Sequence, residues 1–319
     1  MKTLIKLTLF SVILFAFSCE DILEKDISNE IIQIISPTSG TIVLSNVTNF
    51  RWNDLKGANK YRVQVFNSSQ AIVLDSLIKN KNNFASTLAL GQYQWRVRGE
   101  NNAYQSTYTL PVSFSVAPST DLSTQQVILS NPANNYYTNN PAITCTWQSL
   151  PIATSYNFEL INITNGSTVA LQQLNILTGS LSLTSSNFVL DGEYQWKVKA
   201  VNATAQTPFA NRTLFIDRVA PNLPQNSLPL NNAIQITNQA ITFNWTTSAG
   251  AGVVQSPINY TVEFSNSSTF ATLIQTSNST TNSLQQTFTA SGDYYWRIKA
   301  TDSAGNSSAF SAPFKFTIN

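Results

Sequence analysis

Short runs of alternating apolar and polar residues recur along most of the chain, and one of them appears three times. The three segments read GQYQWRVRG at 91–99, GEYQWKVKA at 192–200 and GDYYWRIKA at 292–300. A period of two residues predicts β-strands with one buried and one exposed face. In the first copy this alternation places Tyr93, Trp95 and Val97 inside, and Arg96 and Arg98 outside. The other two copies predict the same faces.

Each copy of this strand belongs to a longer segment, and the three segments share one order of features. Each opens with a proline turn, continues with a strand that ends in tryptophan, and has a second alternating strand before the repeated one. The tryptophans that end the earlier strand are Trp52, Trp147 and Trp245. The tryptophans of the repeated strand follow one another at intervals of 101 and 100 residues. This interval indicates tandem domains rather than a solenoid, whose units are shorter.

The strand lengths, the turns between them and the size of each repeat indicate an all-β protein. Short alternating strands within a segment of about 100 residues are typical of an antiparallel β-sandwich. We predict three such sandwiches in tandem after a cleaved signal peptide. The predicted segments are a signal peptide at 1–18, an acidic lipid-anchored tether at 19–30, and domains at 31–117, 125–217 and 219–319. Prolines in the linkers 117–125 and 217–225 predict semi-extended connections.

All six tryptophans fall on predicted inner faces, two in each domain. They are Trp52, Trp95, Trp147, Trp196, Trp245 and Trp296. We interpret them as core anchors, which leaves no tryptophan as a platform for sugar stacking. Cys145 stands where the other copies have Phe50 and Phe243, so we expect a small core residue rather than a reactive thiol. One thiol within the domains cannot form an internal disulfide.

These features resemble fibronectin type III-like and bacterial immunoglobulin-like domains. The resemblance rests on the tryptophan of the second strand and on the approaches LALGQY, VLDGEY and TASGDY to the repeated strand. It implies a tyrosine corner, in which the phenol bonds to backbone a few residues upstream. The resemblance covers nearly the whole chain after residue 31. It implies the fold and almost nothing about function, because this fold hosts many roles.

The N-terminal segment, MKTLIKLTLFSVILFAFSC, predicts export from the cytoplasm. Two lysines precede an apolar run that is too short to span a bilayer, as in a signal peptide. The ending AFSC resembles the lipobox of bacterial lipoproteins, which implies a lipid on Cys19; the alternative is an ordinary secretory signal with a coincidental cysteine. The acidic residues after the cysteine resemble the surface-export signals of Bacteroidota lipoproteins; they are Glu20, Asp21 and Glu24. The alternative is a solvated, extended tether, and both interpretations can be true. We expect an outer-membrane location that faces the cell surface.

The composition excludes several classes of chemistry. The chain has no histidine, which removes the commonest general base, the usual serine and cysteine triads and most zinc sites. Outside the predicted signal peptide, basic and acidic residues balance, so no overall field attracts nucleic acid. The sequence has no phosphate-binding loop and no metal-ligand spacing. We therefore predict no catalytic residue, no metal, no cofactor and no nucleic-acid partner.

The first domain differs from the other two in its excess of basic residues. In the second and third domains, Glu159 and Glu263 are predicted to pair with the outward cations of the repeated strand. The first domain has basic and amide residues in those places. We group four arginines as a candidate face for lipopolysaccharide or a membrane protein. They are Arg51, Arg62, Arg96 and Arg98. The alternative is a solvated face that folds back on the acidic tether.

Four tyrosines remain outside the predicted cores and are candidate glycan contacts. They are Tyr104, Tyr108, Tyr136 and Tyr137. Tyrosine beside asparagine suits sugar recognition, because a flat ring and amide hydrogen bonds lie together. Scattered exposed tyrosines are also ordinary surface residues. The third domain carries an insertion, SAGAGVVQSP, which we interpret as a contact or hinge toward the second domain rather than a ligand pocket.

These patterns favour a non-catalytic, lipid-anchored cell-envelope protein that acts as a surface spacer, scaffold or adhesion module. The first alternative is a glycan-binding accessory lipoprotein of a polysaccharide-utilisation system. The second is a hydrolase built on Asp and Glu, which needs two carboxylates roughly 5–10 Å apart in a cleft. The expected partners are the membrane, through the N-terminal lipid, and an envelope protein, lipopolysaccharide or glycan.

Overall fold

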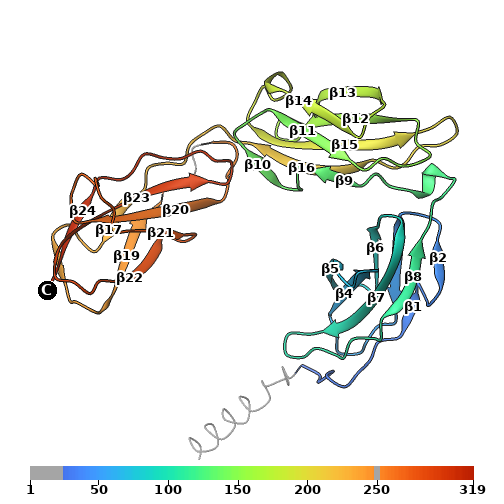
Figure 1. The fold of residues 1–319 in the computed structure, drawn as a ribbon, viewed down its shortest axis with the longest axis horizontal. Coiled ribbons are helices and arrows are strands. Elements are labelled where there is room, and N and C mark those ends of the chain that lie inside the picture. The colour runs from blue at the N-terminus through green and yellow to red at the C-terminus, as the bar shows by residue number, and fades with distance from the viewer. Residues whose placement is uncertain (1–23, 248–251) are drawn as a thin grey trace, which may run out of the picture. The chain divides into compact units, whose positions relative to one another are not determined.

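The computed structural model describes residues 24–247 and 252–319, which form strands and two 3-10 turns. The chain divides into two compact units, Met1–Gln125 and Gln126–Asn319. The first unit contains one pair of sheets and the second contains two pairs, each pair joining a five-stranded and a three-stranded sheet (Figure 1). The prediction of three tandem β-sandwiches is confirmed. The pairing is antiparallel except at β2, β10 and β18, which lie parallel to the last strand of their sandwich.

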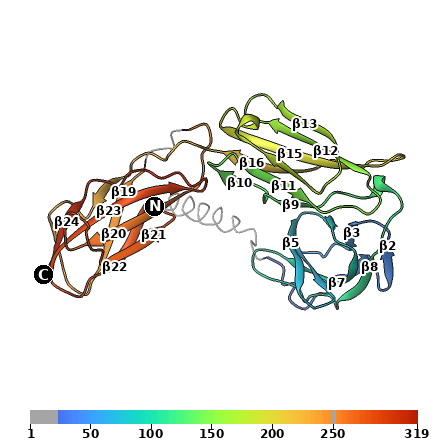
Figure 2. The same cartoon turned by 45° about the horizontal axis from the view of Figure 1, so that its top comes forward.

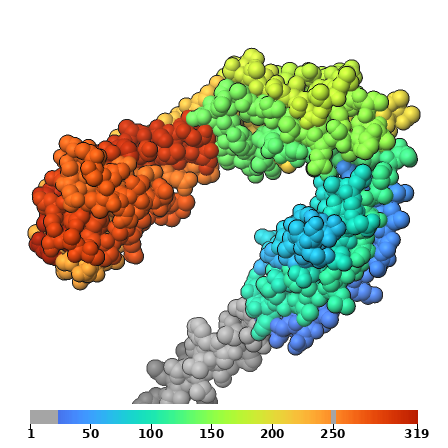
Figure 3. Space-filling view, in the orientation of Figure 1, coloured from blue at the N-terminus to red at the C-terminus, as the bar shows by residue number. Residues whose placement is uncertain are grey.

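The first unit holds the strands β1 to β8. Its five-stranded sheet has the order β2 (Thr41–Val43), β8 (Val112–Val116), β7 (Gly91–Glu100), β4 (Lys60–Asn67) and β5 (Ile72–Lys79). Its three-stranded sheet has the order β1 (Ile34–Ser36), β3 (Val47–Trp52) and β6 (Asn83–Thr87). The edge strand β5 and its neighbour β4, in light blue, lie at the visible surface in Figure 3.

The second unit holds two sandwiches, and the strands of each follow the same order. The first of them pairs the sheet β10 (Tyr136–Thr138), β16 (Ala210–Ile216), β15 (Gly192–Val201), β12 (Ser155–Asn162) and β13 (Thr168–Ile176) with β14 (Ser180–Leu183), β11 (Ile143–Trp147) and β9 (Leu129–Asn131). The other pairs β18 (Ala233–Gln235), β24 (Phe314–Ile318), β23 (Gly292–Asp302), β20 (Ile258–Ser265) and β21 (Gln275–Ser279) with β17 (Gln225–Leu228), β19 (Ala240–Thr246) and β22 (Ser283–Thr287). Figure 2 shows β13 and β10 at opposite edges of their sheet.

Burial follows the predicted alternation closely. In β3, Phe50 and Trp52 are fully buried while Arg51 between them is exposed. All six tryptophans are buried, and the least buried of them, Trp147, has only 4% of its surface exposed. An aromatic side chain of this size removes roughly 150–250 Å² from water, so these residues dominate the energy of each core.

The paired tryptophans join the two sheets of each sandwich through other aromatic rings. The earlier tryptophan packs against the tyrosine that begins the next strand, with ring centroids 5.3–5.6 Å apart in the three copies. The tryptophan of the repeated strand packs against Phe50 in the first copy and Phe243 in the third. Cys145 replaces that phenylalanine in the second copy, where Trp196 contacts Phe158 instead. Burial raises the pKa of the Cys145 thiol to about 12, as expected of a core residue.

A tyrosine corner closes each sandwich. The phenol oxygens of Tyr93, Tyr194 and Tyr294 donate to the carbonyl oxygens four residues upstream, at 2.9, 2.8 and 2.8 Å. The resemblance to fibronectin type III-like domains implied this bond, and it is present in all three copies. It ties the start of the repeated strand to the turn before it, and so fixes which residues of that strand face the core.

The segment 24–30, the last part of the predicted acidic tether, packs onto the first sandwich. Ile27 is fully buried, and the Asn101 side chain donates to the carbonyl oxygen of Lys25 at 2.9 Å. Thr107 donates to the carbonyl oxygen of Ser28 at 3.2 Å. The segment can dock because Gly57 has no side chain and so leaves room for Ile27. The remaining tether residues and Cys19 lie outside the described part of the chain.

The first linker is also more compact than expected. Leu122–Thr124 forms a 3-10 turn, the Asp121 carboxylate accepts from the backbone N–H of Ser123 at 2.8 Å, and Leu122 is fully buried. The semi-extended prediction for 117–125 is therefore wrong, because a capped turn buries the one large apolar side chain of this linker. The second linker has no regular element between β16 and β17.

Gly57 tests the docking of the segment 24–30. Its φ is +101°, and an added Cβ would lie 2.9 Å from the Lys25 side chain and 3.2 Å from Ile27. We expect Gly57→Ala to release the segment, so that trypsin cleaves after Lys25 several-fold faster than in the wild type. Gly40→Ala is the matched control, because Gly40 also has a positive φ, +80°, but its Cβ would meet nothing within 4 Å. Both variants carry a backbone strain of about 1–2 kcal/mol. Equal cleavage rates in the two variants would contradict the docking.

Candidate interaction surfaces

The outer face of each five-stranded sheet carries a cluster in which two cations lie over one aromatic ring. In the first copy the guanidinium carbons of Arg96 and Arg98 lie 4.2 and 4.7 Å from the ring centroid of Tyr108. Lys197 and Lys199 lie over Phe209 in the second copy, and Arg297 and Lys299 over Phe310 in the third. Such contacts stabilise a surface by about 0.5–1 kcal/mol each. These aromatic residues lie 13 or 14 residues after the second tryptophan of each copy. The sequence-based prediction did not recognise this repeated spacing.

Carboxylates complete this cluster in the second and third copies, as predicted. Glu159 pairs with Lys197 at 2.8 Å, and Glu263 pairs with Arg297 at 2.7 Å. The hydrogen bond from Lys197 is the main reason that the pKa of Glu159 lies below its usual value. Both pairs are partly exposed, so each contributes about 0.5 kcal/mol.

The arginines of the first copy are also engaged by neighbouring side chains. Arg62 pairs with Asp75 at 2.9 Å and with Glu100 at 3.1 Å, and Arg98 pairs with Glu100 at 2.8 Å. Arg96 donates twice to the side-chain oxygen of Gln64. A hydrogen bond from Gln64, ahead of the bond from Arg62, holds the pKa of Asp75 below its usual value. Much of the positive charge assigned to this face is thus neutralised within the sheet.

Arg51 does not belong to the same face as the other three arginines. It lies on β3 of the three-stranded sheet, whereas Arg62, Arg96 and Arg98 lie on β4 and β7 of the five-stranded sheet. The two sheets of a sandwich present their outer faces in opposite directions, so the grouping of four arginines was wrong in this respect. The sequence order alone does not tell which sheet each strand joins.

The four candidate tyrosines are not gathered on one surface. Tyr108 is held by the arginines described above, and Tyr137 stacks on Phe215 with ring centroids 4.5 Å apart. Tyr104 and Tyr136 are the more exposed pair, at 36% and 41%. They belong to different units, and Tyr136 borders a hollow in the surface. Of the proposed export residues, Glu24 accepts from Asn102 at 2.7 Å, while Glu20 and Asp21 lie outside the described residues.

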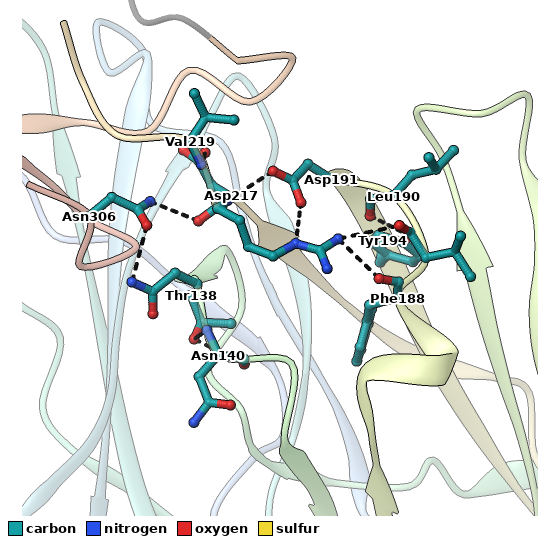
Figure 4. A network of polar contacts seen from close by, with 12 residues as sticks. Thr138, Asn140, Phe188, Leu190, Asp191, Tyr194, Asp217, Val219 and Asn306 are labelled. Carbon is teal, nitrogen blue, oxygen red and sulfur yellow. Dashed lines mark hydrogen bonds and ion pairs between the residues drawn. The ribbon is translucent and has the colours of Figure 1, made fainter.

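Within the second unit, polar contacts surround the linker that joins its two sandwiches (Figure 4). The buried Asp217 accepts from the hydroxyl of Ser256, in the insertion of the third copy, and its carbonyl oxygen accepts from the Asn306 side chain at 2.8 Å. Asn306 in turn accepts from the Asn139 side chain at 3.1 Å. For its described residues, the insertion therefore makes the contact toward the second domain that its position predicted.

The next linker residue is held by the second sandwich. Arg218 pairs with Asp191 at 2.6 Å and donates to the carbonyl oxygen of Phe188 at 3.0 Å (Figure 4). Asp191 and Phe188 flank the tyrosine corner of Tyr194. The linker is thus fixed at its first two residues by the two sandwiches that it connects.

Known proteins match this chain in fold. The residues 228–318 match a family model described as "Rha78A-like, N-terminal immunoglobulin domain". The crystal structure of chicken CNTN1 FN1–FN3 domains is 16% identical and covers 90% of this chain and 97% of its own, with a TM-score of 0.44. The fibronectin(III)-like modules of Clostridium thermocellum CbhA are 14% identical and cover 60% of this chain and 93% of their own, with a TM-score of 0.35. No curated protein sequence matches the chain. The all-β tandem sandwiches seen in the strand topology agree with the immunoglobulin domain named by the family match at 228–318.

Glu100 offers a test of how tightly the outer face of the first copy is neutralised. Its side chain is 9% exposed and accepts from two arginines, so Glu100→Gln removes two ion pairs from a nearly buried position. We expect the transition of the first unit in urea to lose about 1–3 kcal/mol. The matched variant Glu159→Gln removes one partly exposed pair, so the second unit should lose only about 0.5 kcal/mol. Equal losses would show that Glu100 does not neutralise the arginines of this face.

Proposed function

We propose that the chain is a non-catalytic, lipid-anchored cell-envelope protein whose three sandwiches act as a spacer, scaffold or interaction module. One observation carries this proposal: the aromatic and charged groups repeated in every copy serve the sandwich itself. The tryptophans are in the cores, the tyrosines close the corners, and the paired cations lie over rings and carboxylates of their own sheet. Domains of the immunoglobulin-like and fibronectin III-like fold are typically non-catalytic, and the fold by itself names no particular interaction role.

The N-terminal segment supports the anchoring part of the proposal. Cys19 would carry the lipid, and two or more acyl chains would give stable attachment. Since the residues from Glu24 onward pack onto the first sandwich, the chain between Cys19 and Glu24 can reach about 17 Å at most. The lipid would therefore hold the loops 55–57 and 101–107 near the membrane surface. Among the described residues, no helix has the length and apolar character that a membrane span requires.

We also propose an anionic partner for the first sandwich, with fewer arginines available to it than the sequence suggested. Among the described residues, Arg51 and Arg96 have no ion pair, and they lie on opposite outer faces. Lipopolysaccharide or an acidic envelope protein would then compete with Asp75 and Glu100 for Arg62 and Arg98. Such competition favours a weak, salt-sensitive contact.

Cell fractionation and protease shaving test the anchor and its orientation together. In a bacterium that sorts lipoproteins, we expect the wild type to incorporate radiolabelled palmitate, to sediment with the outer membrane and to be cleaved by external protease. Cys19→Ala should lose the label and leave the membrane fraction, while Cys145→Ala should keep both. The variant Glu20→Ala/Asp21→Ala/Glu24→Gln should stay labelled but become protected from the protease.

Asn102→Ala is the control for the acidic variant, because it removes the same hydrogen bond from Glu24 without changing a charge. It should be cleaved as readily as the wild type. Label that persists in Cys19→Ala would refute the anchor. Protection of the wild type in intact cells would refute surface display and would place the spacer in the periplasm.

A further inference from the structure

A hollow of about 390 Å³ lies beside Tyr136 on the second sandwich, between the edge strand β10 and the neighbouring three-stranded sheet. Its lining includes Asn131 and Pro132 on one side, and Thr138 and Asn140 on the other. Its volume falls within the range of roughly 300–1,000 Å³ that is usual for small-molecule sites. All of its lining residues are uncharged.

The three copies of the repeat show that this lining belongs to the second sandwich alone. Tyr136, Thr41 and Ala233 occupy the same register, since each pairs with the residue that also pairs with the corner tyrosine of its copy. Asn131 and Asn140 lie five residues before and four residues after this position. The other copies carry Ser36 and Ser45, or Leu228 and Thr237, at these places. The second copy therefore has an aromatic ring between two carboxamides, at positions where the other two copies have neither group.

Hydrogen bonds hold both sides of the hollow in place. On one side, the Arg212 guanidinium donates to the carbonyl oxygens of Leu129, Ser130 and Pro132. The Trp95 indole donates to the equivalent carbonyl, that of Pro37, in the first copy. In the second copy the Arg212 guanidinium, rather than the tryptophan indole, donates to this carbonyl oxygen. Among the described residues, the Trp196 indole has no hydrogen-bond partner.

On the other side, Thr138 donates to the carbonyl oxygen of Asn140 and accepts from its backbone N–H, at 3.2 and 3.0 Å. The side-chain oxygen of Asn140 accepts from the N–H of Ala142 at 2.9 Å, which fixes the orientation of its amide. In Figure 4 this amide points away from the contacts around Asp191 and Asp217. A site held in this way loses little freedom when a ligand binds.

Two polar groups beside Tyr136, the Asn131 carboxamide and the Asn140 side-chain nitrogen, are available to bind a ligand. Within residues 24–247 and 252–319, neither the Asn131 carboxamide nor the side-chain nitrogen of Asn140 has a hydrogen-bond partner. An aromatic face attracts the weakly positive C–H groups of a sugar ring, and carboxamides can both donate to and accept from hydroxyl groups. The lack of charge in the lining disfavours phosphate or carboxylate ligands, which prefer cationic partners.

We infer that this hollow is a binding site for a neutral glycan, with Tyr136 as the platform and the amides of Asn131 and Asn140 as hydrogen-bonding groups. The inference rests on the proposed interaction module and names a ligand class for it. It is independent of the lipid anchor, whose test uses palmitate and protease rather than sugars. If the glycan test fails, the lipid-anchor proposal is unaffected, and the reverse also holds.

Affinity electrophoresis of the full chain tests this site directly. Native gels would contain amylopectin, xylan, galactomannan, mixed-linkage β-glucan or, as an anionic comparison, heparin. We expect at least one neutral polysaccharide to retard the wild type. Tyr136→Thr, which installs the residue of the first copy, should abolish the retardation, and so should Asn131→Ser/Tyr136→Thr/Asn140→Ser. Tyr104→Thr is the control, because Tyr104 has similar exposure in the other unit.

Near-ultraviolet circular dichroism would show that the variants keep the packing of the wild type, which is expected because they copy a sibling domain. Retardation of Tyr136→Thr equal to that of the wild type would overturn the site. Retardation by heparin alone would overturn the neutral ligand, and no retardation by any of the four neutral polymers would overturn the inference as a whole.

Discussion

The burial of two tryptophans between two sheets is the interaction on which each sandwich depends. The described residues contain one cysteine, Cys145, which is free and buried, so no internal disulfide supports these domains. Each copy instead joins its sheets through aromatic contacts, such as Phe50 with Trp95 and Phe243 with Trp296. Since large buried rings contribute most of the hydrophobic energy of a small domain, the pair is kept in all three copies. A tryptophan with that role cannot also lie at the surface to bind a ligand.

The outer faces follow from the same alternation. A strand that buries Trp and the Val or Ile two residues later must expose the residues on either side of that Val or Ile, and in every copy these are two cations. Cations at neighbouring outward positions repel each other, and rings or carboxylates beside them offset this repulsion. Tyr108, Phe209 and Phe310 supply the rings, and Glu100, Glu159 and Glu263 supply the carboxylates. The basic appearance of the sequence therefore does not become a freely accessible basic surface.

Much of the fold could be predicted from the sequence, because the alternation of single residues decides which side chains enter the core. The faces of β3 and β7, the core position of Cys145 and the pair between Glu159 and Lys197 all follow from local pattern. Arg51 could not be assigned in this way, since a strand does not record which sheet it joins. The docking of Ile27 also escaped prediction, because it depends on a loop about thirty residues away. The sequence alone did not distinguish Tyr136 from the other candidate tyrosines. Its place as a binding candidate became clear only from the strand register of the three copies.

The central claim is that all six tryptophans are structural, and acrylamide quenching of their fluorescence tests it most directly. The account predicts blue-shifted emission and weak quenching in the native full chain, unchanged by neutral polysaccharides and rising sharply in urea. Ligand binding at Tyr136 would leave this signal almost unaffected, because no tryptophan lines the hollow. A readily quenched fraction in the native chain that a polysaccharide protects would contradict the account, since at least one tryptophan would then lie at a binding surface.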